Sequence, residues 1–275
     1  MNEFNPDPAV PPRVLATDLD GTFIPLPDAP ANRDALETFR AARRGGNPGL
    51  VFATGRHLES VLDAVAQHNL PLPDWIVCDV GTSICRRRGE TFERFVPYDQ
   101  ALADRTHGAD RAAVEDLLAG LDGLDLQPPE RQQRFKISYF TPAGQVERLA
   151  EEAGRRLRRA RLPYAGLASI DDFNGTGLLD ILPTGASKAA ALIWLAAHAD
   201  FSPDEVVFAG DSGNDFPALA CGFRAIVVAN ASPGLAGQVR RELTARGLEH
   251  RLCLSALPAT SGVLEGCRRF GLLPG

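Results

Sequence analysis

The chain has 275 residues, of which 44% are hydrophobic and 23% charged, the ordinary composition of a globular protein with one large or two modest domains. The net charge of −6 argues against a general nucleic-acid-binding protein, because a phosphate backbone requires a basic surface. No apolar stretch approaches the roughly 18 residues of a membrane span. Residues 1–12 lack the basic and apolar regions of a secretory signal and are expected to form a flexible lead-in.

The cysteines show no CxxC spacing, which indicates reduced thiols in a cytoplasmic protein rather than a disulfide framework or a zinc site. They are Cys78, Cys85, Cys221, Cys253 and Cys267.

Short apolar runs, rich in β-branched or aromatic residues, each stop at a polar or glycine-containing turn. Near-continuous apolar runs are typical of strands that are covered on both faces, as in a parallel sheet. The expected strands are residues 14–17, 50–53, 75–78, 206–209 and 225–228.

Helical spacing of apolar residues between these runs predicts helices over 32–44, 58–68 and 187–198. Strands that alternate with helices predict a doubly wound, Rossmann-like α/β core with a parallel sheet and right-handed crossovers. Ligands bind beyond the carboxyl ends of the strands in such sheets. Asp18, Thr54, Gly81 and Asp211 are therefore expected to gather at that edge.

The middle of the chain is more polar and has fewer candidate strands. Residues 134–140 and 166–173 are expected strands, and 109–121 and 145–161 are expected helices. This pattern predicts a smaller α+β domain over residues 86–179, inserted into a core of residues 13–85 and 180–275.

Two carboxylates, Asp18 and Asp20, follow the first expected strand in the segment Asp-Leu-Asp-Gly-Thr. Side chains two apart on a strand point to the same face, so both acids are expected at one place. The alternative is a pair of solvated acids, which is common at strand ends.

The segment Gly-Asp-Ser-Gly-Asn-Asp, residues 210–215, follows another buried strand. Asp18 and Asp211 together offer hard oxygen ligands, which suit Mg²⁺ better than Zn²⁺. The alternative for Asp211 is a helix N-cap.

Two further segments are typical of an anion site. Thr54, Gly55 and Arg56 combine a hydroxyl, backbone N–H groups and a helix start, although Thr-Gly is also an ordinary turn. Lys188 opens an expected helix, where a cation opposes the helix dipole, so a nearby anion explains it better than helix stability does.

Taken in chain order, the four segments resemble the four motifs of the haloacid dehalogenase-like phosphohydrolases. They are residues 18–22, residues 54–56, Lys188 and residues 210–215. The insert is similar to the large cap of the type-two members. Within the superfamily, the chain is similar to the sucrose-phosphate phosphatase branch in residues 79–82, 135–139, 180–183, 210–215 and 260–265. The sequence departs from that branch at Ser83 and at residues 177–179, which touch the expected sugar pocket, so the resemblance implies a sugar phosphate without fixing which sugar.

The resemblance implies that Asp18 is the nucleophile that forms an aspartyl-phosphate, and that Asp20 is the general acid and base. It implies a Mg²⁺ site, phosphate-binding groups and substrate-binding groups. The metal residues would be Asp18, Asp20 (through its backbone carbonyl), Asp211, Asn214 and Asp215; the phosphate-binding residues Thr54, Gly55 and Lys188; and the substrate-binding residues Arg56, Gly81, Thr82 and Lys136.

The expected function is therefore Mg²⁺-dependent hydrolysis of a sugar phosphate monoester, either a disaccharide phosphate or a glycosyl-glycerate phosphate. Two alternatives remain open: a phosphotransferase or mutase on the same scaffold, and a non-catalytic module that binds a sugar phosphate. The expected partner is a small-molecule sugar phosphate, with no nucleic acid and no membrane. The sequence leaves the oligomeric state open and is compatible with a monomer.

Overall fold

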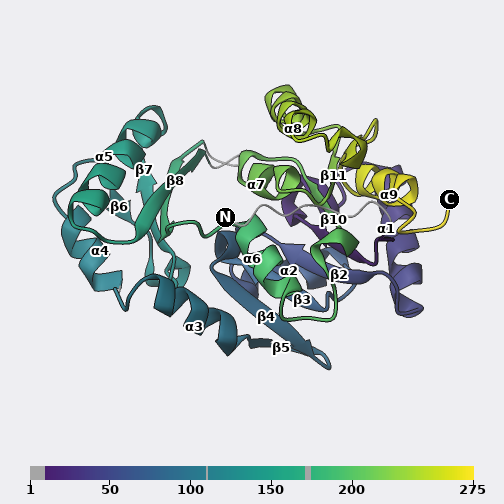
Figure 1. The fold of residues 1–275 in the computed structure, drawn as a ribbon, viewed down its shortest axis with the longest axis horizontal. Helices are drawn as coiled ribbons and strands as arrows, with labels where there is room; N and C mark the ends of the chain where they lie inside the picture. Colours follow the sequence, from purple (N-terminus) through teal and green to yellow (C-terminus); the bar gives the residue numbers. More distant parts are fainter. Residues whose placement is uncertain (1–9, 110, 171–174) are drawn as a thin grey trace. The chain divides into compact units, whose positions relative to one another are not determined.

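A computed structural model describes residues 10–109, 111–170 and 175–275, and the chain divides into two compact units. The first unit contains the chain up to Arg94 and then Ser187–Gly275, and the second contains Phe95–Ala186. Figure 1 shows the fold with its elements labelled. Most of the expected lead-in, residues 1–9, lies outside the described residues.

The first unit is built on an eight-stranded sheet in the order β12-β11-β10-β1-β2-β3-β4-β5. Neighbours from β12 to β3 pair in parallel, whereas β4 and β5 add an antiparallel edge. The strands are β1 (Val14–Thr17), β2 (Gly49–Ala53), β3 (Trp75–Cys78), β4 (Ser83–Arg88), β5 (Thr91–Arg94), β10 (Val206–Gly210), β11 (Arg224–Val227) and β12 (Leu252–Leu254).

Helices connect the strands of this sheet. They are α1 (Pro30–Arg44), α2 (Leu58–His68), α6 (Lys188–Ala196), α7 (Phe216–Ala220), α8 (Pro233–Ala245) and α9 (Ala259–Arg269). Side chains from α1, α2 and α9 share one core cluster with the sheet. The chain runs from β1 to β3 in one direction and from β10 to β12 in the other, so right-handed crossovers place α7 and α8 on the opposite face. The expected doubly wound α/β fold is confirmed.

The core of this unit follows from the alternation of side chains along the strands. Leu15, Phe52 and Ile76 lie on neighbouring strands, are fully buried and belong to the same cluster. Phe23, just beyond β1, packs its ring 5.1 Å from that of Phe39 on α1 and 5.5 Å from that of Phe52. This packing fixes the far end of the loop that carries Asp18 and Asp20.

The second unit is an α+β fold with its own core. Its antiparallel sheet has the order β6-β7-β9-β8. Leu149, Leu179 and Ile181 are fully buried within it. Its elements are α3 (Val96–Arg105), α4 (Arg111–Leu118), β6 (Asp125–Leu126), β7 (Ile137–Thr141), α5 (Val146–Arg159), β8 (Tyr164–Ile170) and β9 (Gly177–Pro183).

The boundaries of the inserted unit differ from the expected residues 86–179. Arg86–Arg88 are the end of β4 and pair with β5 in the first sheet. Residues 180–183 pair with β7 and β8 in the second sheet, because β9 is one continuous strand. The helix α3 was not expected from the sequence, and residues 171–173 of one expected strand lie outside the described residues.

Within the described ranges, no helix combines the length and apolar character needed to cross a membrane. All five cysteines are free thiols.

Candidate active site

Asp18 lies at the carboxyl end of β1, in the middle of the sheet. Its backbone N–H donates to the carbonyl of Ala209 on β10 at 2.9 Å, which extends the parallel pairing by one residue. Its side chain is only 8% exposed, and its Oδ1 lies 3.0 Å from the Nζ of Lys188. The strand therefore delivers one nearly buried carboxylate directly to a buried ammonium group.

Lys188 is the first residue of α6 and is fully buried. Ser187 caps this helix by accepting a hydrogen bond from the N–H of Ala190 at 3.1 Å. The Nζ of Lys188 donates to Asp215 Oδ1 at 2.7 Å as well as approaching Asp18. Burial by itself lowers the pKa of Lys188, but the two carboxylates outweigh burial and raise it above its ordinary value.

Burial dominates the protonation of Asp18. Desolvation raises the pKa of this carboxyl from 3.8 to about 7, with Lys188 opposing the shift and Asp215 adding to it. A buried carboxylate with a raised pKa gains from any further positive charge beside it.

A third carboxylate, Asp211, joins this group. Asp18, Asp211 and Asp215 each place one oxygen within 4.8 Å of the others, which is a spacing that one metal ion can span. Thr22 donates to Asp211 Oδ1 at 2.7 Å. Gly21 has φ +68°, and a Cβ there would overlap the Asp211 carboxylate, so the loop after β1 requires glycine at this point.

Asp215 organises the turn after β10. Its Oδ2 accepts from the backbone N–H of Asp211 at 3.1 Å and from the N–H and hydroxyl of Ser212 at 3.0 Å each. Its Oδ1 accepts from Lys188. Asn214 is tied to the same turn, because its Oδ1 accepts from the Ser212 hydroxyl at 3.1 Å. Asp215 is therefore suited to positioning Lys188 and Asp211, which leaves Asp18 and Asp211 as the stronger pair of metal ligands.

The second acid of the first motif lies apart from this group. β1 ends at Thr17, and residues 19–23 form a loop that is closed by a hydrogen bond from the N–H of Ile24 to Leu19 O at 2.9 Å, with Gly21 at φ +68°. Asp20 therefore lies in this loop and not on the strand. The carboxylate of Asp20 is 45% exposed and accepts from both Nε and the terminal nitrogen Nη2 of Arg56, each at 2.7 Å. Arg56 also donates to the hydroxyl of Ser60 at 2.9 Å. Arg56, one of the expected substrate-binding residues, thus pairs with an acid.

Thr54 and Gly55 follow β2, the strand next to β1. Thr54 is buried, and its hydroxyl accepts from the N–H of Arg56 at 3.2 Å. A Cβ at Gly55 would meet only Val80 at 3.8 Å, so this position is open. Both residues lie at the same sheet edge as Asp18.

A strained turn follows β3. Asp79, Val80 and Gly81 have φ values of 54°, 57° and 91°, and a β-branched residue rarely adopts a positive φ. The turn is held by hydrogen bonds from the N–H of Asp79 to Arg56 O at 3.0 Å and from the N–H of Val80 to Thr54 O at 3.1 Å. Backbone strain of this kind concentrates at functional sites.

Gly81 and Thr82 have positions within this turn that explain their identities. A Cβ on Gly81 would overlap the backbone of Ser187 and approach the N of Lys188 at 2.8 Å. Thr82 is fully buried and donates its hydroxyl to Asp79 O at 2.9 Å. The structure gives both expected substrate-binding residues contacts that stabilise the turn and the start of α6.

Lys136, the remaining expected substrate-binding residue, belongs to the second unit. It lies just before β7 and forms an isolated bridge with Gln133. Its Nζ is 3.5 Å from Asp180 Oδ1, and both side chains are 13% exposed. The hydroxyl of Ser138 donates to the same oxygen at 2.6 Å.

Two residues outside the expected site residues, Asn230 and Thr260, support the first motif. Asn230 donates to Gly21 O at 2.7 Å and accepts from the N–H of Ala259 at 2.8 Å. Thr260 donates its hydroxyl to Phe23 O at 2.9 Å. Asn230 follows the apolar run that contains β11, and this polar residue beyond a strand was the available signal.

The arrangement fits phosphoryl chemistry. One nearly buried carboxylate faces a lysine and a second carboxylate at the carboxyl edge of a parallel sheet, where a helix also begins. A metal ion and the ammonium of Lys188 would offset the repulsion between Asp18 and an anionic substrate.

Comparison with known proteins agrees with this geometry. The family model described as sucrose-6F-phosphate phosphohydrolase matches residues 11–271. The chain belongs to this family. It is thereby a member of the haloacid dehalogenase-like superfamily, as the motifs indicate, and it is a phosphatase.

Several similar proteins cover most of the chain. A mannosylfructose-phosphate phosphatase of Agrobacterium fabrum (strain C58) is 31% identical over 96% of this chain and 99% of its own length. Sucrose-phosphatase 1 of Nicotiana tabacum is 28% identical over 74% of this chain and 46% of its own length. The crystal structure of the sucrose-phosphatase from Synechocystis sp. PCC6803 in complex with sucrose and phosphate has the same fold, with a TM-score of 0.74, 24% identity and coverage of 95% of this chain and 99% of that one.

Proposed function

We propose that the protein hydrolyses the phosphate monoester of a disaccharide in a Mg²⁺-dependent reaction that passes through a phosphorylated Asp18. The observation that carries this proposal is the placement of Asp18 Oδ1, which lies 3.0 Å from the Nζ of Lys188 and in one cluster with Asp211 and Asp215. A glycosyl-glycerate phosphate is the alternative substrate of the same class.

Asp18 acts as the nucleophile. Its carboxylate oxygen attacks phosphorus as the bond from phosphorus to the sugar oxygen breaks, which gives an aspartyl-phosphate and the free sugar. Lys188 offers its ammonium group to the phosphoryl oxygens, where charge accumulates in the transition state. Thr54 and the N–H groups at Gly55 contribute further donors at the same sheet edge.

The site fits a divalent cation with oxygen ligands. Asp18 and Asp211 supply carboxylate oxygens, and the backbone carbonyl of Asp20 is the third expected ligand. The raised pKa of Asp18 is the cost of burying this carboxylate without enough positive charge beside it. Bound Mg²⁺ would supply that charge and also reduce the repulsion between the carboxylate and the phosphate.

Asp20 acts as the general acid and base. It gives a proton to the departing sugar oxygen and later takes one from the water that hydrolyses the intermediate. Both of its oxygens accept from Arg56 in this structure. Proton donation therefore requires Asp20 to turn from Arg56 toward the substrate, and Arg56 holds it in the resting position.

The disaccharide phosphate is favoured by the relatives. The mannosylfructose-phosphate phosphatase aligns with nearly the whole chain, and its name specifies a phosphorylated disaccharide. Residues 83 and 177–179 differ from the branch pattern, which favours a disaccharide other than sucrose.

A substrate panel tests the proposal. Release of inorganic phosphate is measured from mannosylfructose phosphate, sucrose 6-phosphate, glucosylglycerate phosphate, glucose 6-phosphate and p-nitrophenyl phosphate, with Mg²⁺ and with EDTA. We expect the highest kcat/KM for a disaccharide phosphate and loss of turnover in EDTA. Turnover that is equal in Mg²⁺ and in EDTA would refute the metal site. A higher kcat/KM for a monosaccharide phosphate would refute the disaccharide phosphate as the substrate.

A further inference from the structure

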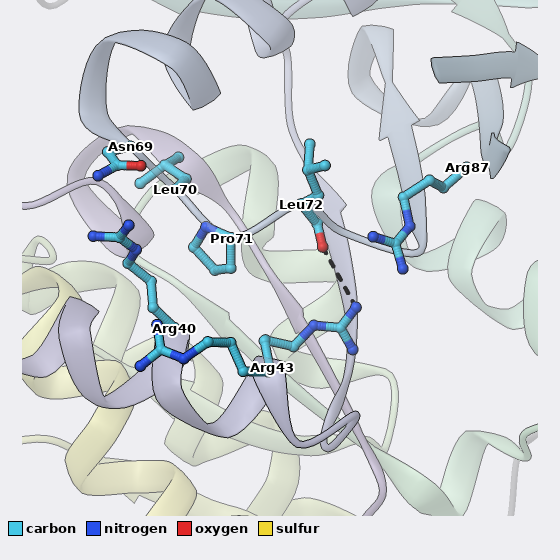
Figure 2. Close-up of a pocket in the computed structure, with 8 residues that line it drawn as sticks. Arg40, Arg43, Asn69, Leu70, Pro71, Leu72 and Arg87 are labelled. Carbon is cyan, nitrogen blue, oxygen red and sulfur yellow. Dashed lines mark hydrogen bonds between the residues drawn. The ribbon is translucent and has the colours of Figure 1, made fainter. Parts of the chain in front are cut away.

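A basic cavity lies at the edge of the sheet opposite Asp18. Its volume is about 390 Å³, and it is lined by Arg40, Arg43, Arg44, Asn69, Leu70, Pro71, Leu72 and Arg87. Figure 2 shows Arg40 and Arg43 extending from α1 toward the segment 69–72. Arg87 belongs to β4. We call this space the arginine cavity.

The topology separates the arginine cavity from the active site. α1 ends at Arg44 before the start of β2, and residues 69–72 precede the start of β3. Arg87 lies beside the start of β3, because its N–H donates to Asp74 O at 3.0 Å. These residues therefore lie at the amino edge of the parallel strands, whereas Asp18 follows the carboxyl end of β1.

The charges of the arginine cavity are only partly balanced. Asp74 Oδ1 accepts from Arg43 at 2.8 Å and from Arg87 at 3.2 Å, so one carboxylate balances the charge of only one of these two guanidinium groups. Arg40 pairs with Glu37 at 2.6 Å, but Glu37 is 61% exposed, and an exposed pair of this kind is weak and easily exchanged. Arg44 has no ion pair with any residue in the described ranges. Four guanidinium groups against two carboxylates leave two positive charges, in a protein whose net charge is −6.

Arg43 provides a fixed anchor in the arginine cavity. Its side chain is 11% exposed and donates to the carbonyl of Pro48 at 2.7 Å and, through Nη2, to that of Leu72 at 3.4 Å. Its Nε is buried without a hydrogen-bond partner among the described residues. A buried donor without a partner costs free energy that a suitable acceptor would recover.

We propose that the arginine cavity is a second ligand site, which binds a doubly charged phosphate group. The planar fork of arginine matches the oxygens of phosphate, and a phosphate monoester carries nearly two negative charges at neutral pH. The volume suits a small molecule, and Leu70, Pro71 and Leu72 give an apolar wall beside the charged one. Free inorganic phosphate and a phosphorylated sugar share this chemistry.

Calorimetric titration with inorganic phosphate and with glucose 6-phosphate, both in EDTA, tests the site. The variant R40Q/R44Q removes two cavity charges from the surface of α1, and R33Q/R241Q removes two exposed charges that do not line the cavity. We expect R40Q/R44Q to weaken the cavity affinity about tenfold or more, because charge-assisted hydrogen bonds are lost. The matched control should bind like the wild type. Equal affinity of R40Q/R44Q and the control would overturn the proposal.

The same titrations identify the source of the phosphate. Tighter binding of glucose 6-phosphate than of inorganic phosphate shows that the apolar wall contacts a sugar, whereas equal affinities identify free phosphate as the ligand. Crystals soaked in tungstate provide the direct readout. An anomalous peak beside Arg43 supports the site, and a peak confined to the Asp18 edge overturns it.

The site does not depend on the proposed function. We expect R40Q/R44Q to keep the wild-type circular dichroism spectrum and the wild-type rate on p-nitrophenyl phosphate, because Asp18 lies at the other edge. A wild-type protein that binds phosphate in the arginine cavity but shows no phosphatase activity would refute the proposed function alone.

Discussion

Asp18 combines the properties that a phosphoryl-accepting carboxylate needs. It is almost buried, lies beside the ammonium group of Lys188 and shares a cluster with Asp211. The sequence predicted this residue from its position after an apolar strand. Its raised pKa follows from burial, which only the structure shows.

The substitution Asp18→Asn should abolish turnover, because the neutral amide cannot attack phosphorus. We expect less than about one per cent of wild-type kcat on p-nitrophenyl phosphate. The fold should persist, since Lys188 keeps its contact with Asp215. Urea unfolding provides the control. A folded variant with substantial turnover would exclude Asp18 as the nucleophile.

The substitution Asp20→Asn should distinguish substrates by their leaving groups. A sugar alkoxide must be protonated as it departs, whereas p-nitrophenolate is stable without a proton. We expect kcat for the sugar phosphate to fall about 100- to 10,000-fold, the usual size of general acid–base catalysis, and kcat for p-nitrophenyl phosphate to fall much less. Equal losses on the two substrates would assign Asp20 a structural role instead.

At the scale of elements, the turn after β3 connects two parts of the site. Its residues 79–81 have positive φ values, and its backbone contacts both the loop after β2 and the start of α6. The sequence predicted that Gly81 lies at the carboxyl edge of the sheet and that it binds substrate. The close approach to Ser187 gives a different reason for glycine there, which depends on a helix that is distant in the sequence.

The substitution Gly81→Ala should destabilise the protein and displace Lys188. Gly89 is the matched control, because its φ is +64° but a Cβ there meets nothing within 4 Å. We expect Gly89→Ala to cost about 1–2 kcal/mol from its backbone conformation alone. Gly81→Ala should cost about 1–3 kcal/mol more from overpacking against Ser187. Urea unfolding measures both, and equal costs would show that the contact with Ser187 relaxes freely.

At the scale of the whole molecule, burial of Asp18 couples stability to pH. In the folded protein the pKa of the Asp18 carboxyl is about 7, compared with the ordinary value of 3.8 for an aspartate in water. The folded state therefore binds more protons between these values, and the free energy of unfolding falls as the pH rises through them. This contribution is fully present below the lower value and is lost above the higher one.

Thermal unfolding in EDTA tests this coupling. The Tm of Asp18→Asn minus that of the wild type should increase as the pH rises from about 4 to about 8, because only the wild type charges a buried carboxylate. Excess Mg²⁺ at the higher pH should raise the wild-type Tm more than that of the variant, since a ligand that binds only the folded state stabilises it. Parallel Tm profiles in EDTA would contradict the raised pKa.

The boundary of the inserted unit shows where sequence patterns stop being informative. Arg86–Arg88 have the composition of a surface loop, yet they pair with β5 at the antiparallel edge of the sheet. One face of an edge strand can remain in solvent, so its sequence need not be apolar. The apolar residues Ile181 and Leu182 resemble a core strand but belong to β9, because the second unit has a core of its own.

The sequence by itself determined the doubly wound core and predicted the residues at its carboxyl edge, including Asp18, Thr54 and Asp211. These follow from local rules, since buried parallel strands require apolar runs and the turns beyond them carry the polar groups. Only the tertiary structure decided that Asp20 pairs with Arg56, that Gly81 packs against Ser187 and that arginines from α1 and β4 line one cavity. These contacts join segments that are distant in the sequence, and their geometry depends on how the strands pair and how the helices cross the sheet.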